Sequence, residues 1–448
     1  MIVMPATVES ASRSTRLTRT EALDTVALAA KLLYKNGQTS QRVVLAVERL
    51  GHALSLPLTL HLSWSELALQ VEGMPYSEMV GAMPLGVDMG KVLGVMRVID
   101  QVCEGKLPPE DARCAVEVAA SHYAPASTPR FALFAALGAA ALGVIFGATE
   151  AVSLLLMAFS AGLGALFRRW LAKVSENPFI QPLSAALLAG VVAAAADRLQ
   201  LSGAASSLTA LCPCMILVPG PHILNGAIDM ARARVAIGLP RLTYAGLLIL
   251  AISIGLLVGL EACGAALPPA VSSPGVPFTA DVTAAGCAAA AFGTFFSIPW
   301  RLLPLPIAVG MLAHGARWAA ISFAGADVAT GAFVACLLAG LVVAPVADRL
   351  HLPFAALGFS AVVSMMPGFF LFHAASDLSE LVSIGSRAPV DLLIGIVSNG
   401  ATAFLIILAM TFGLILPRML LSRFLPPASR RLPTQVENKM PGFMQGAD

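Results

Sequence analysis

Long stretches of the chain after residue 130 are apolar at nearly every position, without the alternation that marks a half-buried strand. A membrane crossing needs about 20 apolar residues, because the hydrocarbon core of a bilayer is about 30 Å thick. The sequence therefore predicts ten membrane-spanning helices, near residues 131–149, 151–169, 182–199, 203–222, 243–263, 281–299, 303–323, 327–346, 353–372 and 390–416. We interpret the chain as a polytopic membrane protein embedded in a lipid bilayer.

Residues before 130 follow a different pattern, which predicts a small α+β domain. Helix start and stop residues flank four amphipathic stretches: Thr20 and Gly37, Ser40 and Gly51, Asp88 and Gly105, and a start at residues 108–111. Between the second and third stretch, leucines alternate with polar residues over 58–64 and again over 67–71. Such alternation on both sides of a short polar segment is typical of a hairpin.

Composition and charge agree with this division and exclude several classes of protein. Of the 448 residues, 57% are hydrophobic and 12% are charged, against about 25% charged in soluble proteins. The 28 basic residues barely exceed the 26 acidic ones, so there is no basic surplus for nucleic acid. A soluble enzyme, a disordered regulator and a nucleic-acid binder are excluded. The seven cysteines are scattered and predict no disulfide framework.

The distribution of basic residues predicts the orientation in the membrane. The first residues lack a signal-peptide pattern, which favours a cytoplasmic amino terminus. With that start, three basic residues fall in outer loops: Arg198, Arg317 and Arg387. Thirteen fall in the inner loops and the tail: Arg168, Arg169, Lys173, Arg232, Arg234, Arg241, Arg301, Arg349, Arg418, Arg423, Arg430, Arg431 and Lys439. This excess favours both termini in the cytoplasm.

The membrane part contains an internal repeat. Leu187-Leu188-Ala189-Gly190 and Ala196-Asp197-Arg198-Leu199-Gln200-Leu201 recur as Leu337-Leu338-Ala339-Gly340 and Ala347-Asp348-Arg349-Leu350-His351-Leu352. The repeat spans five predicted helices, and units with an odd number of crossings enter the membrane from opposite sides. The sequence thus predicts two inverted repeats, which are typical of secondary transporters. Scaffolds and channels with internal repeats are the alternative.

The fourth helix of each repeat is predicted to break within the membrane. Pro219-Gly220-Pro221 interrupts the first copy and Pro367-Gly368 the second, because proline removes an amide donor and glycine permits unusual backbone angles. His222, Asn225 and Asp229 follow on one helical face, and His373 and Asp377 follow in the second copy. We predict that these residues bind substrate or ions. A kinked packing helix with polar ends is the alternative.

Further polar residues suggest gates and a coupling ion. Asp197-Arg198 with Asp377 is predicted to gate the outer face, and Asp348-Arg349 with Asp229 the inner face, with helix-end capping as the alternative. No nucleotide-binding motif is present, so the energy source is expected to be an ion gradient or the substrate gradient itself. His222, His373 and the neighbouring carboxylates are the candidates for proton coupling. We interpret His314 as a local polar residue. Cys212-Pro213-Cys214 could suit a soft metal, but its repeat counterparts carry no thiols, so no metal and no cofactor are expected.

The chain resembles the threonine/serine exporter family over about residues 20–420. The resemblance rests on Leu32-Leu33-Tyr34-Lys35-Asn36-Gly37-Gln38-Thr39-Ser40-Gln41-Arg42, on Gly86-Val87-Asp88-Met89, on Val218-Pro219-Gly220 through Asn225 and Asp229, and on residues 292–304. It implies an inner-membrane exporter of small hydrophilic metabolites, driven by the proton-motive force, with a cytoplasmic domain before ten transmembrane helices. Some relatives are split into two chains and are associated with dicarboxylate (succinate) export. Many relatives have Ser-Pro where this chain has Pro221-His222.

Together these observations predict the following organisation: a flexible terminus (1–20), a cytoplasmic α+β domain (21–128), a first five-helix membrane repeat (129–265), an outer proline-rich linker (266–280), a second five-helix repeat (281–418) and a cytoplasmic tail (419–448). The predicted function is proton-coupled export of threonine, serine or a similar small amino acid across the inner membrane. The alternatives are a dicarboxylate exporter and a membrane-anchored enzyme or sensor acting through residues 1–130. Assembly into a homo-oligomer is left open.

Overall fold

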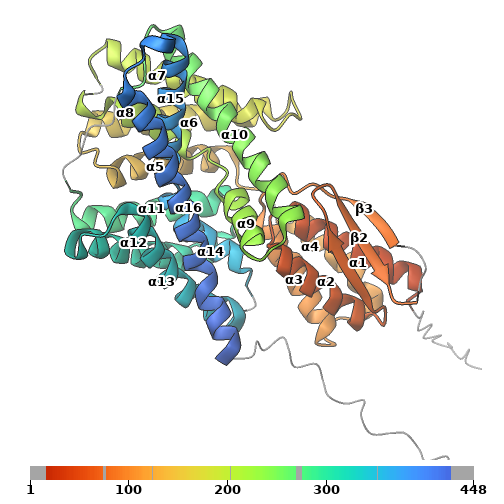
Figure 1. Ribbon diagram of the computed structural model, residues 1–448. Helices are drawn as coiled ribbons and strands as arrows, with labels where there is room; N and C mark the ends of the chain where they lie inside the picture. Colours follow the sequence, from red (N-terminus) through yellow and green to blue (C-terminus); the bar gives the residue numbers. More distant parts are fainter. Residues whose placement is uncertain are drawn as a thin grey trace, which may run out of the picture.

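The computed structural model describes residues 17–73, 77–123, 125–201, 203–268, 275–350 and 352–424. Most of the predicted flexible terminus and cytoplasmic tail, and part of the predicted linker, lie outside the described residues. The N-terminal region contains α1 (Arg19–Lys35), α2 (Ser40–Ala53), α3 (Met89–Cys103) and α4 (Ala112–His122), with a small sheet between α2 and α3. Figure 1 shows this region beside α9 and α10 of a larger helical part.

The sheet of the N-terminal region is antiparallel, in the order β1-β2-β3. Its strands are β1 (Leu58–Leu62), β2 (Glu66–Val71) and β3 (Ser77–Gly81). Leu60 pairs with Leu69, and the leucines of β1 and β2 point into the core, which confirms the predicted hairpin. The sequence did not predict β3, because this edge strand lacks a buried apolar face and its Met79 is 58% exposed.

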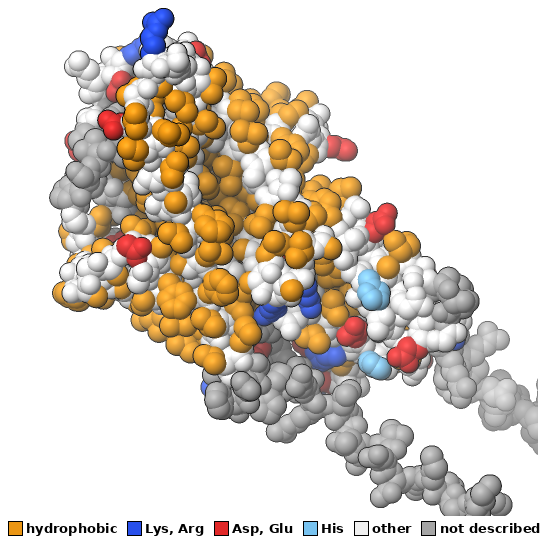
Figure 2. Space-filling view, in the orientation of Figure 1, with side chains coloured by type: hydrophobic (Ala, Val, Ile, Leu, Met, Phe, Trp, Pro, Cys, Tyr) orange, Lys and Arg blue, Asp and Glu red, His pale blue; other side chains and the backbone are white. Residues whose placement is uncertain are grey.

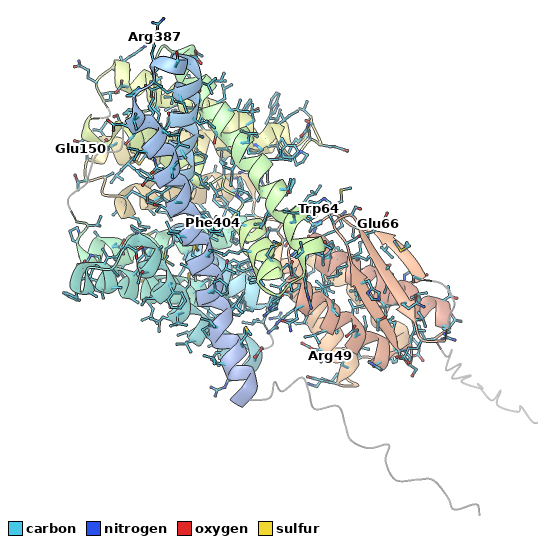
Figure 3. All side chains as sticks on the ribbon, viewed as in Figure 1. Arg49, Trp64, Glu66, Glu150, Arg387 and Phe404 are labelled. Carbon is cyan, nitrogen blue, oxygen red and sulfur yellow. The ribbon has the colours of Figure 1, made fainter. Side chains whose placement is uncertain are left out.

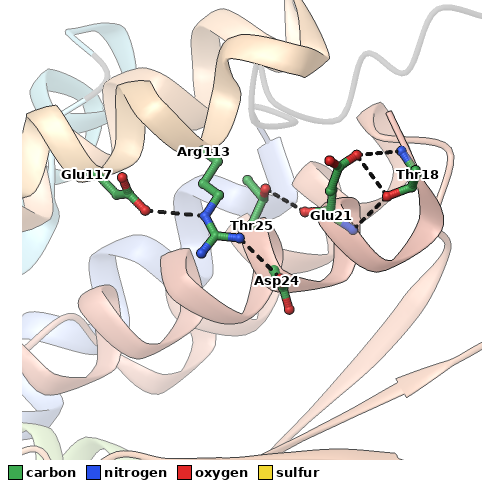
Figure 4. A network of polar contacts seen from close by, with 6 residues as sticks. All are labelled: Thr18, Glu21, Asp24, Thr25, Arg113 and Glu117. Carbon is green, nitrogen blue, oxygen red and sulfur yellow. Dashed lines mark hydrogen bonds and ion pairs between the residues drawn. The ribbon is translucent and has the colours of Figure 1, made fainter. Parts of the chain in front are cut away.

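Capping residues explain where the helices of this region begin. Asp88 caps α3 as predicted, since its carboxylate accepts from the Lys91 amide. α1 begins two residues earlier than expected, because Thr18 and Glu21 form a reciprocal capping box. Figure 4 shows this box, and beside it Arg113 of α4 joining Asp24 of α1 to Glu117. These exposed ion pairs orient α4 against α1 but add little stability.

The helical part is divided into two sets of helices. The first set contains α5 (Thr128–Ile145), α6 (Ala151–Leu171), α7 (Ile180–Arg198), α8 (Ser206–Met215), α9 (Gly220–Ala231) and α10 (Val235–Ala262). The second contains α11 (Phe278–Phe295), α12 (Pro304–Ala324), α13 (Val328–Arg349), α14 (Phe354–Val362), the short 3-10 turn η4 (Val363–Met365), α15 (Gly368–Ile384) and α16 (Val390–Phe424). The chain bends by 65° between α8 and α9, and by 50° between α14 and α15.

Length and hydropathy support seven to nine membrane spans among the described residues, rather than the ten predicted. Seven helices qualify singly, and each of the two bent pairs may be counted as one further span. The predicted span 281–299 corresponds to α11, which is not among them. Asp281 and three threonines lower the hydropathy of this 18-residue helix. Apolar side chains nevertheless cover most of the visible surface of the helical part, whereas charged and histidine side chains gather over the N-terminal region (Figure 2).

The same pairs of helices pack together in both sets. α7 packs along α10 in the first set, and α13 packs along α16 in the second. Both pairs approach closely through glycine: a Cβ atom at Gly190 would lie 2.4 Å from the Leu256 carbonyl oxygen, and one at Gly340 would lie 3.2 Å from the Gly413 carbonyl oxygen. Small residues allow such backbone contacts between helices in lipid. This packing explains why the Leu-Leu-Ala-Gly segment occurs twice.

Contacts with the N-terminal region distinguish the two ends of the helical part. We define the proximal end as the one where Asp229, Phe296 and Asp348 contact that region. The distal end is the opposite one, where the chain turns between α5 and α6, α7 and α8, α12 and α13, and α15 and α16. Figure 3 shows Glu150 and Arg387 away from the N-terminal region, and Trp64 beside α10.

Candidate site at the two helix breaks

The two helix breaks lie against each other inside the helical part. A Cβ atom at Gly220 would lie 3.0 Å from Val363 Cγ1, and one at Gly368 would lie 3.1 Å from Met215 Cγ. Each glycine therefore contacts the segment that enters the other break. Pro219 and Pro367 directly precede α9 and α15, with φ near −79° and −78°. The breaks are thus buried in protein, where irregular backbone is tolerated in a membrane protein.

A cavity of about 700 Å³ lies on the distal side of the breaks. Met365, Met366 and Pro367 of the second break line it, and Phe369 and Phe370 line it from the first turn of α15. Ligand pockets commonly have volumes of about 300–1,000 Å³ with a few polar groups in an apolar wall. The polar side chains of this wall come from several distant segments: Thr149, Glu150, Ser207, His314, Arg317 and Ser364.

A buried hydrogen-bonded group connects this wall to α11. His314 Nδ1 lies 3.3 Å from Asp281 Oδ2, and His314 Nε2 lies 3.0 Å from Ser364 Oγ. The side chains of His314 and Asp281 are only 1% and 3% exposed. The interpretation of His314 as a local polar residue missed these contacts. No periodicity or spacing could have found them, because they join three separate elements, α11, α12 and η4.

On the proximal side, α9 is covered by the N-terminal region. Asp229 accepts a hydrogen bond from Ser40 at 2.8 Å and forms an ion pair with Arg241 of α10 at 2.9 Å. The Asn225 amide donates to the Gly37 carbonyl at 3.3 Å. Ser40 was expected to cap α2, but its hydroxyl is directed to Asp229 instead. The predicted residues of the first break therefore contact the N-terminal region.

His222 and Pro221 lie at the start of α9. The imidazole of His222 packs edge-on against Tyr244 of α10, with ring centroids 5.2 Å apart, and Tyr244 in turn contacts Trp64 of the N-terminal region at 5.5 Å. Pro221 is buried in the first turn of the helix. These contacts fix α9 between α10 and the N-terminal region.

The predicted residues of the second break have different surroundings. His373 stacks against Phe369 with ring centroids 4.5 Å apart, and its Nε2 is buried without a partner among the described residues. Asp377 accepts a long hydrogen bond of 3.5 Å from Asn399 of α16. Phe369 lines the cavity, so His373 lies directly behind the cavity wall.

The predicted gate residues are separated in the structure. Asp197 and Arg198 are exposed at the distal end of α7 and form no ion pair with a described residue. Asp348, at the proximal end, pairs with Arg42 of α2 at 2.7 Å, while Arg349 is exposed. Neighbouring residues on a helix point in different directions, which is why neither aspartate reaches the arginine beside it. The contact of Asp348 with the N-terminal region was not predicted.

Two family models match the chain, one on each set of helices. The family described as "Putative threonine/serine exporter" matches residues 24–262, and the family described as "Threonine/Serine exporter, ThrE" matches residues 281–420. The chain belongs to the threonine/serine exporter family. No solved structure matches the chain. Members of this family are transporters rather than enzymes, and the apolar helices make the chain a multi-pass membrane protein.

The boundary between the two family models coincides with a boundary of the fold. The first match ends at the last residue of α10, and the second begins within α11. Each match therefore contains one set of helices with its bent pair. The first match also includes nearly all of the N-terminal region, which is consistent with the contacts of that region with α9.

Proposed function

We propose that this protein exports threonine, serine or a similar small amino acid in exchange for protons, by alternating access at the two helix breaks. The mutual contact of the breaks, with a cavity on one side and close packing on the other, carries this proposal. A transporter needs a central site that is open to one side of the membrane at a time. The cavity approaches the breaks from the distal end, while the N-terminal region covers α9 at the proximal end.

Helix directions support an inverted repeat. α5 begins at the proximal end and its counterpart α11 begins at the distal end, because Phe296, just after α11, contacts Met89 of the N-terminal region. Equivalent helices therefore run in opposite directions. We infer that the two sets of helices exchange roles during transport, one break opening as the other closes.

Charge supports a cytoplasmic proximal end. The turns of the proximal end carry Lys173, Arg232, Arg234 and Arg301, whereas the distal end carries Arg198 and Arg387. We therefore propose that the N-terminal region and both termini are cytoplasmic, in the plasma membrane of the cell. In that orientation, the cavity faces the outside and the structure corresponds to a substrate-release state.

The charges of the cavity favour an amino acid over a dicarboxylate. Its wall contains the cationic Arg317 and the anionic Glu150. The ammonium and carboxylate groups of an amino acid can pair with Glu150 and Arg317, respectively. A dicarboxylate would place a second carboxylate beside Glu150, and the two like charges would repel. The contacts of Ser40 and Gly37 with α9 also argue against a separate enzyme, since they direct the N-terminal region toward the transport path.

Flux measurements on the full-length protein in proteoliposomes test this function. Vesicles preloaded with labelled threonine, serine or succinate are followed with and without an imposed pH gradient. We expect threonine or serine release that the gradient accelerates, and no such release in Gly220→Leu, whose side chain would collide with Val363. Release of succinate alone would favour the dicarboxylate alternative. If no compound leaves faster than from protein-free vesicles, the proposed function is wrong.

A further inference from the structure

The buried group formed by Asp281, His314 and Ser364 has no counterpart in the first set of helices. By the repeat offsets of 150 and 148 residues, Phe131 and Ile216 correspond to Asp281 and Ser364. Both line a small space of about 10 Å³ between α5, α6 and the first break, together with Gly164, and Ser160 and Arg168 also line it. The positions equivalent to the buried group therefore carry no polar side chain, and the repeated fold does not require this particular group.

Burying this polar group costs free energy of hydration, which indicates that the group is retained for a function. A carboxylate and an imidazole at nearly zero exposure lose hydration that their mutual hydrogen bond only partly replaces. Ionisable side chains within membrane segments are retained mainly where they carry ions or protons. We propose that Asp281, His314 and Ser364 form the proton-coupling site of this exporter, an inference that rests on the proposed function.

The geometry gives protons a path from the cavity to the helix break. His314 and Ser364 both line the cavity, whereas Asp281 lies behind His314 and contacts its other ring nitrogen. Ser364 belongs to η4, the turn that leads into the second break. A proton entering from the distal side therefore reaches His314 first, at the atom that faces the moving segment.

Protonation would change the hydrogen bond at the break. In the neutral imidazole with Nδ1–H donating to Asp281, Nε2 accepts from the Ser364 hydroxyl. When a proton adds to Nε2, both ring nitrogens become donors, so the Ser364 hydroxyl must rotate and accept instead. The proton stays on the imidazole until it is released, and Asp281 balances its charge. Each protonation state thus favours a different arrangement of η4, which is what coupling requires.

The other charged groups near His314 can influence its protonation, but none of them takes its place between Asp281 and Ser364. Arg317 lies one turn further along α12 and lines the cavity, and Glu150 lines it from the α5–α6 turn. The helix packed beside them, α14, has no ionisable residue. Those of α13 are the buried Cys336 and, at its far end, Asp348 and Arg349, with Asp327 as its N-cap. Among the described residues, Asp281 is the one carboxylate within ion-pair distance of His314.

Comparison of exchange with gradient-driven flux tests the proposal. Full-length wild type, Asp281→Asn and His314→Gln are reconstituted, with Glu261→Gln, an exposed carboxylate near the distal end of α10, as the matched control. Exchange of labelled for unlabelled threonine is measured without a pH gradient, and efflux is measured with one. We expect Asp281→Asn, which lies behind the cavity wall, to retain exchange within about twofold while the acceleration of efflux by the gradient falls roughly tenfold. His314→Gln should lose the same acceleration. The control should keep both.

Each remaining result contradicts either the coupling site or the function, and the two can be told apart. If correctly folded variants keep the gradient response, the group carries no coupled proton. If they lose exchange together with the gradient response while remaining monodisperse in detergent, the group serves structure or substrate binding instead. Ser364→Ala provides a milder variant that keeps both ionisable residues, and a normal gradient response there would contradict the proposed link to the break. Absence of flux in the wild type would contradict the proposed function itself.

Discussion

The helices α9 and α15 follow equivalent breaks but differ in how they are covered. Every residue of α9 from Gly220 to Asp229 is buried, by α10, by α16 and by the N-terminal region. In α15 only Gly368, Phe372 and His373 are buried, and Leu378 and Val382 are more than half exposed. Duplicated segments of one sequence thus differ in how much protein covers them, and the less covered copy, α15, begins in the wall of the cavity.

This difference shows that the N-terminal region takes part in the closed state. Gly37 of its α1–α2 loop and Ser40, the first residue of α2, contact α9, and Arg42 of α2 reaches Asp348 at the end of α13. We expect the proximal side to open only when these contacts separate. The predictions below test the closed side and the open side in turn, beginning with the largest expected effect.

Removal of the Arg241 side chain should have the largest effect, on the closed side. The side chains of Asp229 and Arg241 are 3% and 2% exposed, and Arg241 also lies over the Tyr34 ring at 5.3 Å. Arg241→Ala leaves a buried carboxylate without its cation, which costs about 3–5 kcal/mol. The midpoint of thermal unfolding of the purified protein should fall markedly. The double variant Asp229→Asn/Arg241→Gln should recover part of the loss, and equal loss in both would contradict the ion-pair explanation.

On the open side, neutralisation of Arg317 should weaken substrate binding. Because this guanidinium lines the cavity, we expect it to bind the carboxylate of the amino acid. Loss of one charged hydrogen bond of about 1.5 kcal/mol raises the KM for threonine roughly tenfold. The KM is measured from efflux at several internal concentrations. Arg387→Gln, in an exposed distal turn, serves as the matched control, and a similar KM in both variants would remove Arg317 from the binding site.

Separation of Arg42 from Asp348 should loosen the closed side by a smaller amount. The two side chains are 14% and 42% exposed, so the ion pair contributes only about 0.5–1 kcal/mol. In Arg42→Ala, backbone amides of residues 37–42 and 220–229 should therefore exchange hydrogen about two to five times faster. Arg49→Ala, which breaks an ion pair with Asp100 inside the N-terminal region, should leave exchange in residues 220–229 unchanged. Faster exchange there in both variants would show a general loss of stability.

The sequence predicted the local features of this molecule and missed the long-range ones. Adjacent proline and glycine mark both helix breaks, so both bends could be predicted, as could the hairpin from its alternation. Single prolines such as Pro240 and Pro345 lie inside continuous helices instead. Contacts between distant segments leave no such signal: Ser40 and Asp229 are 189 residues apart, and Asp281 and His314 are 33 apart. The asymmetry of α9 and α15 was hidden for the same reason, because it depends on where the N-terminal region packs.

The smallest predicted effect concerns Asp88, at the edge of the closed side. Asp88 caps α3, whose first residue donates its amide to the Phe296 carbonyl at 2.8 Å. Burial raises the pKa of the Asp88 carboxyl above its ordinary value, against the opposing effect of hydrogen bonds from the backbone of Lys91 and Gly90. Folding therefore favours the protonated form of this group, and its contribution to stability decreases as the pH rises above about 4, the pKa of an unfolded aspartate.

Asp88→Asn removes this titration and keeps a capping side chain of similar strength. The stability of the variant relative to wild type should therefore rise by a few tenths of a kcal/mol between about pH 4 and pH 6, and then remain constant. The unfolding midpoints of both proteins are measured over this pH range. Because all other titrating groups are the same in both proteins, their contributions cancel in the difference in stability. A relative stability that falls with pH would mean that the Asp88 carboxylate is stabilised by its contacts, so that its charge strengthens the junction of α3 with the proximal end.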